Sequence, residues 1–374
     1  MQEQKIVLYP SNWLYNAGVI GFLRVLEECG EDVENFLQDD GSVKINSCIF
    51  PKIDVNKFYI DKNTRKISII GKNQFYKNYI QKGWELAFEK FVKESLPKAQ
   101  KAQNLNKCDI CGEGYVINLQ NIQDQNSEVI ENIKKFINGI RKFDARLNSI
   151  LGPSKGEFPN SFWSCTASLR VCDLCGYILI HHHLSLTKLQ DGSEIFINAP
   201  SFKLMWHLNN YVRTLYGGKE IKGAKEVLGI SLIELVTKLN IHLGRWEKMN
   251  IEVVSKYRVK KGKNKYEDTV DFFSLSSDIV DLLSDREIAS LLKQIGEFKI
   301  LNMVLDGEFN GILEFGEKAL RDAMKRKSGK DTGTDFINED IKLKKNKEDL
   351  FSFSQKLFKL YALIKSELKK EVIA

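Results

Sequence analysis

Cys108-Asp109-Ile110-Cys111-Gly112 recurs almost unchanged as Cys172-Asp173-Leu174-Cys175-Gly176, so the chain carries two loops of the form CDxCG. Two residues between the cysteines allow both thiolates of a loop to turn toward one point. The glycine that follows can adopt a positive φ, which folds backbone N–H groups over the sulfurs. Each loop supplies half of a tetrahedral ligand set. The full set is Cys108, Cys111, Cys172 and Cys175. Four thiolates at about 2.3 Å suit Zn²⁺ in a structural site.

The separation of the two loops is wide, at roughly sixty residues, whereas a compact zinc finger has about one or two dozen. A shared metal ion would therefore join segments that are distant in sequence. Two alternatives compete: a redox role, which needs a strand-to-helix setting that neither flank provides, and disulfides, which need an oxidising compartment. Cys165 is a further candidate ligand near the second loop. Cys29 and Cys48 have apolar neighbours and are expected to be buried.

The composition is that of a soluble globular protein, with 374 residues, 43% hydrophobic and 28% charged. This length allows two or three domains. The net charge of +7 is compatible with a polyanionic partner. No signal peptide is visible, and the longest apolar stretch, residues 13–26, is too short for a bilayer and contains Asn16 and Arg24. We therefore expect a cytoplasmic protein that does not enter a membrane.

The N-terminal part predicts mixed helices and strands. Residues 5–9 form a short strand, and Asn12 then caps a helix that is apolar nearly all round. Gly18 and Gly21 lie on one face of that helix and allow another element to approach closely. Further predicted elements are a hairpin at 58–70, a helix at 76–91, and a helix at 129–147 between the two cysteine loops.

Residues 177–184 predict a strand leaving the second cysteine loop, with His181 and His183 on one face and His182 on the other. A catalytic or metal-binding role for His181–His183 requires a partner carboxylate, and none is evident nearby in the sequence. A packing or hydrogen-bonding role is the alternative.

A basic segment follows two predicted helices, at 202–216 and 223–243, and a β-like run that starts at Arg245. Positive side chains bracketed by Tyr257 and Tyr266 suit a phosphate backbone with an unstacked base. A solvated basic hairpin is the alternative. The candidate phosphate contacts are Lys256, Arg258, Lys260, Lys261, Lys263 and Lys265. Three polar residues of the helix at 202–216 are candidate readers of base edges: Asn209, Asn210 and Arg213.

After about residue 275 the pattern is helical, with apolar stripes at 288–298, 312–323 and 350–368. The predicted fold class is therefore α+β: a mixed N-terminal domain, residues 1–274, with the tetra-cysteine zinc site and an inserted helical segment, followed by a C-terminal helical bundle, residues 275–374. A phosphate-binding Walker loop, a dinucleotide fingerprint, an HExxH motif and a nucleophile elbow are all missing from the sequence. We therefore predict no enzymatic activity.

Three features together resemble one known family: the N-terminal run Tyr9-Pro10-Ser11-Asn12-Trp13-Leu14-Tyr15-Asn16-Ala17-Gly18 with Gly21, the paired CXXC loops, and the helical tail. The chain resembles, over essentially its whole length, the CRISPR-associated CXXC-CXXC proteins, which are the large subunits of the type I-B Cascade effector complex.

The resemblance implies a non-enzymatic subunit of an antiviral complex. Such a subunit binds the 5′ end of the CRISPR RNA (crRNA) and other Cascade subunits. It reads a protospacer-adjacent motif in double-stranded target DNA and supports R-loop formation. The displaced strand runs over its C-terminal part, which resembles the small subunit, and a helicase-nuclease recruited after binding cleaves the DNA. The alternatives are a zinc-dependent nuclease or RNA-processing enzyme that uses His181–His183, and a stand-alone zinc-ribbon nucleic-acid-binding protein.

Overall fold

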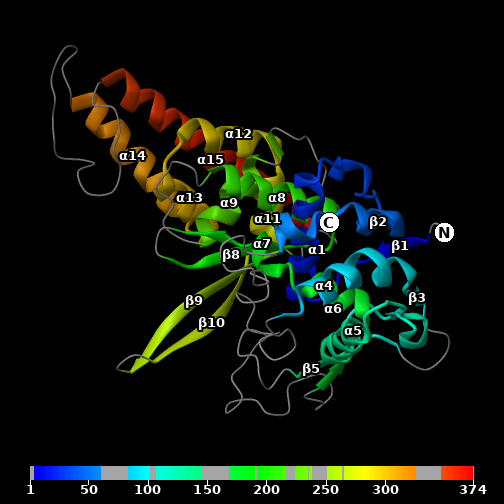
Figure 1. Ribbon diagram of the computed structural model, residues 1–374. Coiled ribbons are helices and arrows are strands. Elements are labelled where there is room, and N and C mark those ends of the chain that lie inside the picture. Colours follow the sequence, from blue (N-terminus) through cyan, green and yellow to red (C-terminus); the bar gives the residue numbers. More distant parts are fainter. Residues whose placement is uncertain are drawn as a thin grey trace. The chain divides into compact units, whose positions relative to one another are not determined.

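The chain folds into a mixture of helices and small antiparallel sheets, which confirms the α+β class. The computed structural model describes residues 4–59, 83–101, 107–144, 168–189, 192–215, 224–234, 236–237, 251–262, 265–325 and 347–373 (Figure 1). The chain divides into two compact units, residues 1–209 with 254–272 and residues 210–253 with 273–374. The second unit resumes at Phe273, close to the predicted boundary after residue 274. It also includes residues 210–253, which the sequence analysis placed in the N-terminal domain.

The first unit contains the cysteine loops and most of the strands. Its helices are α1 (Trp13–Glu28), α2 (Val55–Phe58), α4 (Glu85–Lys90), α5 (Ser127–Ile140), α6 (Asp173–Leu179) and α7 (His182–Ser185). α8 (Phe202–Leu215) contributes residues to both units. The strands pair as β1 (Lys5–Leu8) with β2 (Val43–Asn46), β3 (Gln100–Lys101) with β4 (Tyr115–Val116), and β5 (Lys142–Asp144) with β6 (Ser168–Arg170). The remaining sheet has the order β10-β9-β8-β7, with β7 at Thr187–Lys188, β8 at Glu194–Asn198, β9 at Glu252–Gly262 and β10 at Lys265–Ser274.

Helix α1 is the centre of the first unit, as its apolar sequence predicts. Asn12 caps it, because its side chain accepts a hydrogen bond from the Tyr15 N–H at 3.0 Å. Every residue from Trp13 to Leu26 is buried. A Cβ atom at Gly18 would lie 2.7 Å from the carbonyl oxygen of Ile178, and one at Gly21 would lie 2.1 Å from that of His181. The two glycines therefore allow α6 and α7 to pack directly on the backbone of α1, and this prediction is confirmed.

The second unit is helical in its described part, apart from the ends of β9 and β10. Its helices are α9 (Ala224–Glu234), α11 (Ser277–Ser284), α12 (Arg286–Ile295), α13 (Phe298–Leu305), α14 (Phe309–Lys325) and α15 (Lys347–Ile373). Helices α14 and α15 pack along each other, and the Ser354 hydroxyl donates a hydrogen bond to the Gly316 carbonyl at 2.8 Å. The stripe from Ile288 to Ile295 is buried as expected, whereas Phe298 begins a new helix and is exposed.

Several local predictions are wrong. Residues 177–184 contain the end of α6 and most of α7 rather than a strand, because the apolar run 177–180 is too short to show a period that separates helix from strand. The helix predicted to reach 147 ends at Ile140, and Phe143 lies in β5. Cys48 is exposed and Cys29 is half-buried. Cys48 lies in a short 3₁₀ helix, Ser47–Lys52, that buries Ile49 and Phe50 instead. The hairpin at 58–70 and Cys165 fall mostly or wholly outside the described residues, although Phe58 ends α2.

Candidate metal centre

Both cysteine loops contain the same backbone hydrogen bond, from the glycine to the first cysteine. The Gly112 N–H donates to the Cys108 carbonyl at 2.9 Å, and the Gly176 N–H donates to the Cys172 carbonyl at 2.9 Å. Gly112 has a φ of +72°, as the sequence predicts. At Gly176 the reason for glycine is different, because this residue lies inside α6. A Cβ there would lie 3.0 Å from the Cβ of Ile140 on α5.

The two loops converge on one point. The sulfur atoms of Cys108, Cys111, Cys172 and Cys175 all lie within 4.8 Å of one another, and the Cys111 and Cys172 sulfurs are 3.9 Å apart. Three of these cysteines are buried, and Cys111 is half-buried. The predicted meeting of the two loops is therefore confirmed, and the four sulfurs are positioned to hold a metal ion.

The electrostatics of the cluster favour a bound cation. Burial raises the pKa of the Cys175 thiol well above its ordinary value. Hydrogen bonds from the other three cysteines lower the pKa of Cys108. Because one ionised sulfur in such a cluster disfavours ionisation of its neighbours, four thiolates need a positive charge at their centre. A metal ion supplies that charge and deprotonates the remaining thiols.

The chemistry of the donor set supports this assignment. Four soft sulfur donors within 4.8 Å of one another fit a metal–thiolate centre. The side chain of Tyr15, on α1, is fully buried, and its hydroxyl has no hydrogen-bond partner among the described residues. All four cysteines act electrostatically on this hydroxyl, but none of their sulfurs makes a hydrogen bond with it.

The aspartate of the second loop supports the centre through its own contacts. Asp173 is fully buried and binds the guanidinium of Arg141 through both carboxylate oxygens. The backbone of Ile117 lies between the same two side chains: its N–H donates to Asp173 at 2.6 Å, and its carbonyl accepts from Arg141 at 2.9 Å. The aspartate of the first loop, Asp109, instead pairs with the backbone of Arg170.

Sequence reasoning missed the roles of Asp173 and Arg141 and the position of Tyr15. The signal for the first was visible, since both loops carry Asp at their second position. The signal for the other two was not visible, because Arg141 and Tyr15 are far from the loop in sequence.

The basic segment predicted to bind phosphates lies on β9 and β10, which run side by side as a long two-stranded ribbon (Figure 1). Lys260 is exposed, in agreement with such a role. Lys256 is half-buried, and its ammonium lies 3.4 Å from the carboxylate of Glu194, so part of its charge is already neutralised. Arg258, Lys261 and Lys265 lie on these strands, but their side chains, and Lys263 as a whole, fall outside the described residues.

The three candidate base readers on α8 differ from one another. Asn209 is buried, and its amide bonds to the backbone of Ile197 and Met205. It therefore satisfies the main chain of β8 and is not available to a base edge. Asn210 is half-buried and Arg213 is exposed.

His181 and His182 pack in the interior of the first unit, whereas His183 is half-buried. His181 is fully buried, and its Nε2 lies 2.8 Å from the Tyr59 hydroxyl, while its Nδ1 lies 2.9 Å from the Tyr177 carbonyl. The Tyr59 hydroxyl also lies 2.7 Å from that of Tyr177. Burial lowers the pKa of both His181 and His182 to about 3. Both rings are therefore neutral near pH 7, and each makes a hydrogen bond to a backbone carbonyl.

No helix in the described part of the chain combines the length and apolarity needed to cross a bilayer. No known protein family, curated protein or solved structure matches the chain, so the geometry of the four-cysteine centre is the ground on which a function is proposed.

Proposed function

We propose that this chain is the large subunit of a type I-B CRISPR effector complex, and that one Zn²⁺ ion holds its two cysteine loops together. The observation that carries the proposal is the convergence of two CDxCG loops, about sixty residues apart in sequence, on one cluster of four sulfurs. The paired loops are also the most specific part of the resemblance to the CXXC-CXXC family.

Zinc suits the cluster for geometric reasons. Four sulfurs at about 2.3 Å from a tetrahedral ion lie about 3.8 Å from one another. The Cys111 and Cys172 sulfurs are 3.9 Å apart. Four protein ligands leave no open coordination position, so the ion has a structural role and activates no water molecule. It makes the loops, α1 and the end of α5 a rigid support for a surface that must hold nucleic acid in one geometry.

The remaining parts of the proposal concern partners. The net charge of +7 and the exposed Lys260 on the β9–β10 ribbon favour a polyanion. In the proposed complex the chain binds the 5′ end of the crRNA and contacts the other Cascade subunits. It reads a short motif in duplex DNA and holds the displaced strand, and a separate helicase-nuclease performs the cleavage.

Co-purification tests the proposal. The tagged chain is expressed in its source cells or with its neighbouring genes, and the bound RNA is sequenced while the metal content is measured by mass spectrometry. We expect zinc, a repeat-derived RNA and backbone subunits in the same fraction. Recovery of the chain with zinc but without repeat-derived RNA would favour a stand-alone zinc-ribbon protein and overturn the effector assignment.

A second experiment tests the ribbon. Lys260→Glu is compared with Lys44→Glu, which reverses the charge of an exposed lysine on β2. We expect Lys260→Glu to weaken duplex binding and to reduce the slope of log affinity against log salt by about 1, because one phosphate contact is lost. Equal salt slopes for the two variants would show that Lys260 on the ribbon does not contact the DNA.

A further inference from the structure

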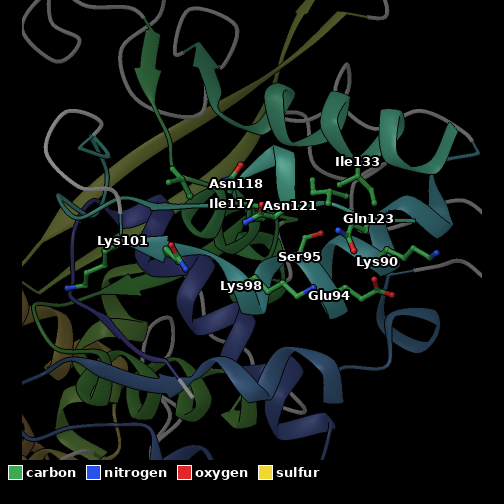
Figure 2. Close-up of a pocket in the computed structure, with 13 residues that line it drawn as sticks. Lys90, Glu94, Ser95, Lys98, Lys101, Ile117, Asn118, Asn121, Gln123 and Ile133 are labelled. Atoms are coloured by element: carbon green, nitrogen blue, oxygen red, sulfur yellow. The ribbon is translucent and has the colours of Figure 1, made fainter. Parts of the chain in front are cut away.

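A polar cavity of about 710 Å³ lies in the first unit, and none of the four cysteines lines it (Figure 2). Its volume falls in the range of about 300–1,000 Å³ that small-molecule-sized sites occupy. One side is formed by residues at and after the end of α4, including Ser95 and Lys98. The other side is formed by the segment that follows β4, including Ile117, Asn118 and Asn121.

The charged side chains of the cavity leave one lysine and one glutamate without an ion pair. The ammonium of Lys90 pairs with Asp124, and that of Lys101 pairs with Glu113. Lys98 and Glu94 are both exposed lining residues, and neither has an ion-pair partner among the residues that the structure describes. Lys98 can therefore bind an anionic group of a ligand, and Glu94 beside it can accept a hydrogen bond from a hydroxyl or amino group of the same ligand.

The facing side carries neutral amides. Asn118, Asn121 and Gln123 line the cavity, and each amide has both a donor and an acceptor. Figure 2 shows Asn118 and Asn121 across the cavity from Lys98 and Ser95. Val116 and Ile122 are half-buried and add apolar surface beside these polar groups, whereas the lining residues Ile117 and Ile133 are buried. Amides beside an apolar wall suit the edge and face of a flat heterocycle.

The walls of the cavity are fixed by contacts already described for the metal centre. Both backbone groups of Ile117 are bonded, its N–H to Asp173 and its carbonyl to Arg141. The Lys90–Asp124 ion pair joins α4 to the loop that carries the amides. The lining residue Gln100 lies opposite Val116 in the β3–β4 pair. The cavity is therefore formed in advance of binding, which lowers the entropic cost of holding a ligand.

We propose that this cavity binds one nucleotide unit of a single nucleic-acid strand. Lys98 holds the phosphate, Asn121 and Gln123 bond to the edge of the base, and the base lies against Val116 and Ile122. A ligand of purely anionic character would use Lys98 but not the amides. An apolar ligand would leave the amides unpaired, so a nucleotide matches both kinds of group. This inference rests on the proposed nucleic-acid-binding function and assigns it a site.

The test uses the full-length zinc-loaded chain and a fluorescein-labelled, mixed-sequence eight-nucleotide strand, made as RNA and as DNA. Binding is measured by fluorescence anisotropy at two salt concentrations. The variants are Lys98→Glu and Asn121→Ala, with Lys44→Glu as the charge-matched control outside the cavity. The Asn121 side chain is exposed and caps no helix, so its removal leaves the fold intact. Circular dichroism and zinc content verify each variant.

We expect Lys98→Glu to weaken binding about tenfold and to lower the salt slope. Asn121→Ala should weaken binding about fivefold at both salt concentrations, because it removes a neutral hydrogen bond. The RNA and DNA arms show which sugar the site prefers. If both cavity variants bind like Lys44→Glu while the wild type binds the strand, the cavity assignment is overturned and the effector proposal stands. Strand binding through the cavity, without co-purifying repeat RNA, would support the cavity and overturn the effector proposal.

Discussion

Arg141 binds Asp173 through two hydrogen bonds, from Nε to Oδ1 at 2.7 Å and from Nη2 to Oδ2 at 2.8 Å. Arg141 follows the last residue of α5, and Asp173 is the second residue of the second cysteine loop. The hydrogen bond to Asp173 also raises the pKa of Arg141. This ion pair joins the segment between the two loops to the metal centre. Its loss should therefore destabilise the cysteine loops.

Asp173→Asn should lower the free energy of unfolding by about 3 kcal/mol, because it leaves the guanidinium of a buried pair without its counter-charge. The measurement is urea unfolding of the zinc-loaded protein. Glu131→Gln is the control, since it removes an exposed ion pair with Lys135 and should leave the free energy of unfolding nearly unchanged. Similar losses in the two variants would show that the Arg141–Asp173 pair contributes no more than a surface pair.

Cys108→Ser should remove most of the bound zinc and a large share of the stability of the first unit. The binding energy of a structural zinc ion, about 10–16 kcal/mol in small domains, is also folding energy. Metal content and thermal melting with and without chelator are the measurements. The exposed Cys48 gives the control Cys48→Ser, which should keep its zinc. A chelator that leaves the wild-type melting temperature unchanged would contradict the zinc assignment.

Tyr15→Phe should leave the free energy of unfolding equal or raise it by about 1 kcal/mol, because it removes a buried hydroxyl that has no hydrogen-bond partner among the described residues. Zinc affinity should stay unchanged, because none of the four sulfurs bonds to this hydroxyl. Urea unfolding measures the first quantity, and competition with a chromophoric chelator measures the second. A lower zinc affinity in the variant would show that the hydroxyl bonds to a thiolate once the metal is bound.

Gly21→Ala should lower the free energy of unfolding by about 3 kcal/mol or more, because the new Cβ would lie 2.1 Å from the carbonyl oxygen of His181. Neither partner in that contact is a flexible side-chain end. Gly311, on α14, is the matched control, since its nearest neighbours are side-chain atoms of Met303 at 3.6 Å. Gly311→Ala should stabilise by about 0.5–1 kcal/mol through helix propensity. The two substitutions should therefore move the melting temperature in opposite directions.

The buried histidines should make the protein less stable in acid. Burial lowers the pKa of His181 and His182 to about 3, so the folded state stays neutral where the unfolded state, with a pKa near 6.5, takes up protons. Their contribution is complete above pH 6.5 and is lost as the pH falls toward 3. At pH 5 each histidine should lower the free energy of unfolding by about 2 kcal/mol relative to pH 7.

His182→Asn isolates this effect, because the asparagine amide can still donate to the Leu179 carbonyl that His182 contacts at 3.0 Å. The free energy of unfolding is measured at pH 7 and at pH 5, with zinc in excess. Its decrease between the two pH values should be about 2 kcal/mol smaller in the variant than in the wild type. An equal loss in both proteins would assign the acid sensitivity to other groups, including the cysteines.

The sequence predicted those features whose signal is local. The cap at Asn12, the buried helix α1 and its two close-approach glycines all follow from neighbouring residues. So does the cysteine set, because the second loop repeats the first. The stripe of α5 from Val129 to Ile140 is also local, and it is buried as predicted.

Other features were set by distant partners and could not be predicted. Arg141 finds Asp173 across 32 residues, and no periodicity marks that pair. The position of Asn209 on a predicted helix made it a candidate base reader. In the structure its amide is instead bonded to the backbone of Ile197 in β8. The segment of α6 and α7 predicts a strand, but it is helical: every residue of α6 is buried, so no polar face marks its period and tertiary packing decides its conformation.

The position of α1 also has a consequence for synthesis. Its neighbours α6, α7 and β8 lie between residues 173 and 198, so the helix emerges from the ribosome long before the elements that bury it. At about 5–20 residues per second the nascent chain carries this apolar helix for roughly ten to thirty seconds. During that interval a chaperone that shields exposed apolar helices would raise the yield of folded protein. Slowing translation before residue 198 should lower it.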